Sequence, residues 1–68
     1  MPLRDRANHV YELMAALRLV DARLDVRAAA DAALGVEDGV FRAAGEKMEY
    51  ERDCAEELDR LRDVYRGM

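Results

Sequence analysis

The stretch Leu34-Gly35-Val36-Glu37-Asp38-Gly39 decides the fold that this sequence predicts. On either side of it lies a run of residues long enough to form one helix. Gly35 suits the left-handed conformation that closes a helix, and Val36 can then fold back on the last turn. Asp38 is a good N-cap for a following helix, with Glu37 near its positive end. The stretch therefore predicts a short connection between two helices.

These features predict an all-α fold, an antiparallel two-helix hairpin with helices at about 5–34 and 39–66. Residues 5–34 are good helix formers without Pro or Gly, and a connection of about three residues makes neighbouring helices antiparallel. Gly45 costs about 1 kcal/mol within a helix, so the sequence leaves open whether the second helix is continuous through it. We expect the whole chain, 1–68, to be a single helical-hairpin domain.

The first helix carries two apolar stripes on roughly opposite sides. One is expected to face the second helix, and it consists of Val10, Leu13, Met14, Leu17, Val20, Leu24 and Ala28. The other has the same spacing of three and four, and it consists of Tyr11, Ala15, Leu19, Ala22, Val26, Ala29 and Ala33. Because a hairpin uses only one stripe, we expect the second to be an oligomer interface through which two copies form a four-helix bundle. Helix propensity alone also accounts for the alanines, and the sequence leaves that alternative open.

The second helix combines an apolar stripe with a row of acidic residues. The side chains expected to be buried are Val40, Phe41, Ala44, Met48, Ala55, Leu58, Leu61 and Tyr65. The acidic residues, spaced three or four apart, form one row that we name the acidic ridge: Glu46, Glu49, Asp53, Glu56, Asp59 and Asp63. Like charges at this spacing are mildly destabilising, which favours a role in binding a protein partner with a basic surface. A solvated face without a partner explains the same pattern.

Length and composition point to a small protein that associates. A chain of 68 residues seldom buries enough apolar area to offset a conformational entropy of about 1.5 kcal/mol per ordered residue. Cys54 is the only cysteine, which suits a reducing compartment. No stretch approaches the ~20 apolar residues of a membrane span, and no signal-peptide block follows the N-terminus. We expect a cytoplasmic protein without membrane contact, and ten Arg against one Lys indicate a bacterial or phage gene.

Residues that usually carry chemistry are few. Ser, Thr and Gln are absent, and His9 has no second His or Cys at ligand spacing, so we expect no enzyme activity, cofactor or metal site. Glu46-x-x-Glu49 and Glu56-x-x-Asp59 resemble the ExxE…ExxD metal-binding pattern of the MazG-like all-α nucleotide pyrophosphatases. That family needs the two pairs on different helices, whereas here both lie on one ridge. With a pI of about 4.9, sequence-independent binding of nucleic acid is disfavoured.

Three functions remain compatible with these patterns. The first is a small non-enzymatic protein-interaction module, a regulator, inhibitor or adaptor, that acts as a homodimer and presents the acidic ridge to a protein partner. The second is a structural or assembly subunit of a phage particle or larger complex. The third is a regulator linked to RNA or DNA, because the expected shape resembles the small dimeric hairpin RNA-binding regulators of plasmid copy number.

Overall fold

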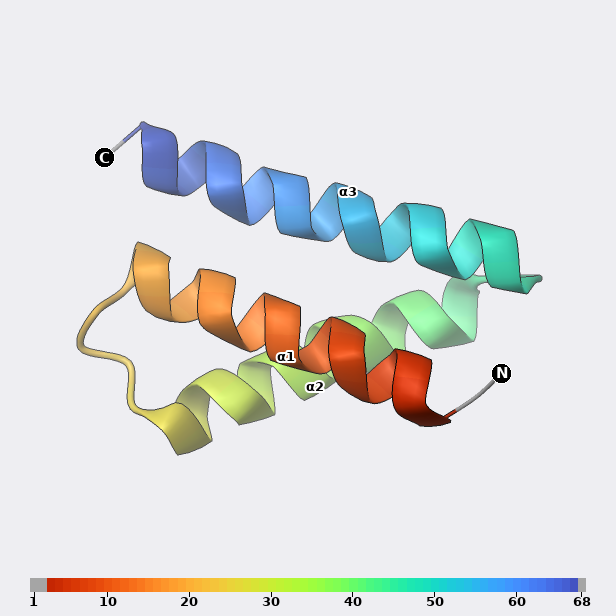
Figure 1. Ribbon diagram of the computed structural model, residues 1–68, viewed down its shortest axis with the longest axis horizontal. Coiled ribbons are helices and arrows are strands. Elements are labelled where there is room, and N and C mark those ends of the chain that lie inside the picture. Colours follow the sequence, from red (N-terminus) through yellow and green to blue (C-terminus); the bar gives the residue numbers. More distant parts are fainter. Residues whose placement is uncertain (1–2, 68) are drawn as a thin grey trace.

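The computed structural model describes residues 3–67, which form three helices (Figure 1). They are α1 (Leu3–Val20), α2 (Val26–Ala43) and α3 (Lys47–Arg66). α1 and α3 run in the same direction, and α2 runs in the opposite one. The start of α1 and the α2–α3 turn lie at one end of the molecule, and the α1–α2 connection and the end of α3 lie at the other. The described residues are thus all-α, as the sequence predicts, but the two-helix hairpin is wrong.

The predicted helix at 5–34 is broken between Val20 and Val26 by two aspartates. The Asp21 carboxylate accepts a hydrogen bond from the Arg23 N–H at 3.0 Å, and the Leu24 N–H bonds the Asp21 carbonyl at 3.1 Å. Asp25 then caps α2, because its carboxylate accepts the Ala28 N–H at 2.7 Å. Aspartate side chains that bond nearby backbone groups compete with the helix in this way. The break therefore needs neither Gly nor Pro.

The expected connection at Leu34–Gly39 lies inside α2. Neither Gly35 nor Gly39 adopts a positive φ, so neither closes a helix. Each costs about 1 kcal/mol relative to Ala in a helix interior, which is too little to end a helix whose neighbouring side chains pack into the protein. The chain turns instead at Ala44–Glu46, where Ala44 and Glu46 are extended. The predicted helix at 39–66 is therefore broken beside Gly45, whose N–H donates to the Glu49 carboxylate at 2.8 Å.

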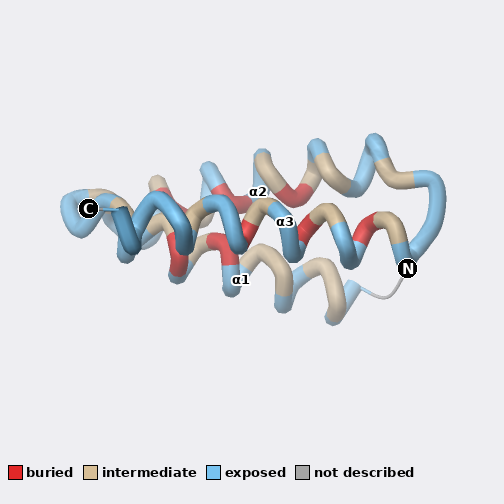
Figure 2. The backbone as a smooth tube through the Cα atoms, turned by 90° about the horizontal axis from the view of Figure 1, so that it is seen from above, coloured by how far each residue is buried: buried red, intermediate tan, exposed pale blue. Residues whose placement is uncertain are grey.

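α1 is central to the packing, because it contacts α2 and α3 more extensively than these two contact each other. The buried positions lie on the inner sides of all three helices (Figure 2). They are Leu13, Ala16, Ala29, Ala33, Tyr50, Cys54 and Leu58, together with one charged residue, Glu37. Four of the seven apolar ones are Ala or Cys, so the core is small. Beyond Leu61 the last residues of α3, 62–66, are all exposed.

Large side chains that were expected to be buried in the second helix lie largely at the surface. Met48, Phe41 and Tyr65 are exposed, because the turn at Ala44–Glu46 gives α2 and α3 separate inner faces. Of the expected set, only Leu58 is buried within α3. The association of two copies into a four-helix bundle stays a prediction. Because the chain forms three helices, the surfaces open to a second copy differ from those of a two-helix hairpin.

Replacing Asp25 by Ala should lower the free energy of unfolding by about 1 kcal/mol, because it removes the side-chain cap of α2. Asp31→Ala is the matched control, since Asp31 is exposed within the same helix and should change stability by less than about 0.5 kcal/mol. Urea denaturation followed by circular dichroism measures both. Equal effects of the two substitutions would show that the cap does not define the start of α2.

Candidate functional site

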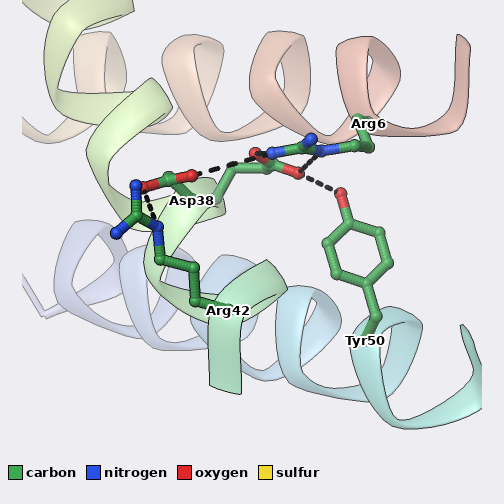
Figure 3. A network of polar contacts seen from close by, with 5 residues as sticks. Arg6, Asp38, Arg42 and Tyr50 are labelled. Carbon is green, nitrogen blue, oxygen red and sulfur yellow. Dashed lines mark hydrogen bonds and ion pairs between the residues drawn. The ribbon is translucent and has the colours of Figure 1, made fainter. Parts of the chain in front are cut away.

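One buried carboxylate, that of Glu37, joins the three helices. Glu37 lies on α2 and is only 3% exposed. Arg6 of α1 donates two hydrogen bonds to it, from Nε to Oε2 at 2.8 Å and from Nη2 to Oε1 at 2.9 Å. The Tyr50 hydroxyl of α3 donates to Oε2 at 2.5 Å. Figure 3 shows Arg6 and Tyr50 reaching this carboxylate from different sides. Both Glu37 oxygens are thus occupied, so this carboxylate acts as a structural link between the helices.

Aromatic rings and a second carboxylate surround this link. The Arg6 guanidinium lies 3.8 Å from the centre of the Phe41 ring, a cation–π contact. Phe41 in turn meets Tyr50 edge to face, with ring centres 6.0 Å apart. Asp38 pairs with Arg42 at 2.9 Å and lies 3.8 Å from Arg6 (Figure 3). Polar contacts therefore run from the buried carboxylate to the surface of α2.

The network shifts the ionisation of its members. The hydrogen bonds from Arg6 hold the pKa of Glu37 below its usual value, although burial opposes this. Burial, and then the hydrogen bond to Glu37, raise the pKa of Tyr50. Burial also raises the pKa of the Cys54 thiol, so the thiol stays protonated at neutral pH. Glu37 is therefore a negative charge held between the Arg6 cation and the neutral Tyr50 hydroxyl.

A small cleft lies beside this network, between α1 and α3. It has a volume of about 80 Å³, and His9, Glu12, Glu51 and Cys54 contribute to its lining. The His9 Nδ1 atom is buried and has no hydrogen-bond partner among the described residues. Within residues 3–67, no three His, Cys, Asp or Glu side chains are arranged to hold a metal ion.

Two larger grooves flank α2. The first, the α1–α2 groove, is strongly apolar and has a volume of about 590 Å³. Its lining residues are Leu3, Arg6, Ala7, Val10, Tyr11, Met14, Val26, Ala30, Leu34 and Glu37. The second, the α2–α3 groove, has a volume of about 540 Å³, and its lining residues are Gly35, Val36, Gly39, Val40, Ala43, Asp53, Glu56 and Glu57. The two grooves share no residue.

The predicted oligomer stripe is divided between two helices and a turn. Tyr11, Ala15 and Leu19 are exposed on α1, Ala22 is exposed in the α1–α2 connection, and Val26 is exposed at the start of α2. Ala29 and Ala33 are fully buried, so the expectation that they face outward is wrong. The physical reason is the turn at Asp21–Asp25, which folds α2 back and places these two alanines in the core. Tyr11 and Val26 line the α1–α2 groove.

All six residues of the acidic ridge belong to α3 or its N-cap, but they differ in their surroundings. Glu49 accepts the Gly45 N–H, Asp53 lies 3.4 Å from the Nε of Arg52, and Asp63 lies 3.6 Å from Arg66. Among residues 3–67, the remaining three, Glu46, Glu56 and Asp59, make no ion pair. Asp53 and Glu56 line the α2–α3 groove.

Within the described part of the chain, no helix is long and apolar enough to cross a membrane. The sequence patterns did not single out Arg6 and Tyr50 of this site, and they placed Glu37 beside a helix N-terminus and not in the core. The spacing Ala29, Ala33, Glu37 carries the signal, since it continues one helical face in steps of four through Gly35. A carboxylate on such a face needs a cationic partner from another helix.

Replacing Glu37 by Gln should destabilise the fold by about 2 kcal/mol, because it removes the charge that three buried or half-buried hydrogen bonds require. Glu57→Gln is the matched control. Glu57 also accepts two hydrogen bonds from one arginine, Arg60, at 2.9 and 3.0 Å, but on the surface of α3, so its loss should cost less than about 1 kcal/mol. Urea denaturation compares the two. A larger effect at Glu57 would contradict the central role of Glu37.

The free energy of unfolding should also fall at acidic pH, because Glu37 becomes protonated there. Because its pKa is lower in the folded chain than the ordinary 4.5, the unfolded chain takes up the proton first as the pH falls. The contribution of the ionised Glu37 to the free energy of unfolding is fully present above about pH 5 and is lost progressively below it. Glu37→Gln lacks this contribution, so its urea midpoint should fall less than that of the wild type between neutral pH and about pH 3. Parallel losses in both proteins would exclude the lowered pKa.

No protein-family model, curated protein or solved structure matches this chain.

Proposed function

We propose that this chain is a small non-enzymatic protein-interaction module that binds a basic segment of a protein partner along the acidic ridge. The observation that carries the proposal is the α2–α3 groove. One wall holds the carboxylates of Asp53, Glu56 and Glu57, and the other holds Gly35 and Gly39 of α2. The groove is shallow, but it brings Asp53 and Glu56 from the centre of the ridge together with a second wall on α2, which a charged row alone lacks.

The two glycines support this reading, because the fold of the single chain does not require them. Neither has a positive φ, and a Cβ added at either position meets nothing within 4 Å. Glycine in a helix interior nevertheless costs about 1 kcal/mol relative to Ala. Two such positions one turn apart allow the backbone of a partner segment to approach α2 closely.

Charge supports the basic character of the partner. Residues 44–67 contain eight acidic and five basic residues, so they hold most of the net charge of −4. Glu56 and Asp59 are exposed and make no ion pair within residues 3–67. Lysine or arginine side chains of a partner can pair with them at little desolvation cost, and the surrounding negative potential speeds association.

Exchanging Glu56 and Asp59 for Lys should abolish capture of the partner without loss of helicity. The matched control exchanges Glu12 and Asp31 for Lys, which changes the net charge equally at two exposed acidic residues outside the ridge. The tagged proteins are used to capture binding partners from the native host, and binding of each captured protein is then measured in purified form at low and high salt. We expect wild type and control to bind the same protein, more weakly at high salt. Equal binding by all three variants would exclude the ridge.

A second pair of variants tests the groove separately from charge. Gly39→Leu places a large side chain in the α2–α3 groove, and its Cβ meets nothing within 4 Å. Because Leu favours a helix more than Gly does, α2 should stay folded while the partner is blocked. Ala32→Leu is the control, because Ala32 is exposed on α2 and lines neither groove. Undiminished binding by Gly39→Leu would place the partner on the ridge but outside the groove.

A further inference from the structure

The single chain leaves more surface exposed than its size requires. Its accessible surface is 4906 Å², whereas a monomeric protein of 7.7 kDa exposes about 4300 Å² on average. The excess of about 600 Å² is close to what one chain buries in a modest protein interface, since standard interfaces bury about 800 Å² per partner. Burial of one such interface would therefore reduce the accessible surface of the chain to the average for a monomeric protein of its mass.

Much of the exposed apolar surface surrounds the α1–α2 groove. Leu3, Tyr11, Val26 and Leu34 line it, and each is more than half exposed. Ala7 and Ala30 also contribute to the lining, and their small side chains allow a helix to approach closely. Among the described residues of the lining, only Arg6 and Glu37 are charged, and they bond to each other, so the lining formed by residues 3–67 offers no free charge to a ligand. Its occupant must be apolar.

We propose that a second copy of this chain occupies the α1–α2 groove, so that α1 and α2 of two copies pack together with both α3 helices outside. In a two-fold dimer the same patch of each copy faces its counterpart. Residues 3–43 contain seven acidic and six basic residues, so this side is nearly neutral and can meet itself without repulsion. The acid-rich α3 cannot do so, and it stays free for another partner.

The mass in solution tests this proposal directly. Sedimentation velocity over micromolar to millimolar concentrations should give the wild type twice the chain mass of 7.7 kDa. Tyr11→Arg and Leu34→Arg should give monomers, because each places a charge in the apolar groove. Tyr65→Arg and Val64→Arg are the matched controls, since Tyr65 and Val64 are about half exposed on α3, outside the groove, and these variants should stay dimeric. Circular dichroism confirms that each variant is helical.

A monomeric wild type at all concentrations would overturn the proposal, as would groove variants that remain dimeric. If the arginine variants lose helicity, Tyr11→Ala and Leu34→Ala replace them, and each should weaken the dimer at least tenfold relative to Tyr65→Ala. The result is independent of the acidic ridge, because the variant that combines Glu56→Lys and Asp59→Lys should remain dimeric. Loss of partner capture and loss of the dimer are therefore separate outcomes.

Discussion

The fold depends on the carboxylate of Glu37, because each helix contributes one member to its network. Arg6 is 31 residues away along the chain and Tyr50 is 13 residues away. A core of three alanines, a cysteine and three larger side chains could pack in several arrangements at similar free energy. A buried charge allows few of them, because any arrangement that separates it from Arg6 and Tyr50 leaves polar groups unpaired. The network thus determines how the three helices pack against one another more than it raises the free energy of unfolding.

The sequence predicts part of this fold well, namely the helical class and the inner face of α1. Val10, Met14 and Leu17 pack against the core, and Leu13 is buried in it. These residues follow a regular helical spacing, and that spacing is the most reliable sequence signal. The ends of the helices were not predictable in the same way. The glycines at 35 and 39 do not break α2, whereas the hydrogen bonds of Asp21 and Asp25 to the backbone separate α1 from α2.

Of the candidate binding site between α2 and α3, only the acidic residues were predictable from the sequence. The acidic ridge follows from spacing on one helix, whatever the rest of the fold. The concave wall opposite it does not, since Gly35 and Gly39 face α3 only because α2 continues through them. Likewise, the exposed apolar surface beside Tyr11 exists because the chain folds back at Asp21–Asp25. Both grooves are therefore products of tertiary packing, and they share no lining residue.

The exposed end of α3 has a consequence for the dynamics of the chain. Beyond Leu61 no described side chain is buried, so little tertiary packing opposes the opening of these last turns. Their backbone amides should exchange with solvent at a free energy of opening near zero, while those around Tyr50 open only with the whole domain. Asp63 belongs to this exposed segment, whereas Asp53 and Glu56 lie on the part of the same helix that holds the buried residues Tyr50, Cys54 and Leu58. A partner that extends along the whole ridge must therefore order the last turns of α3 as it binds, so its contacts there add less affinity than those at the centre.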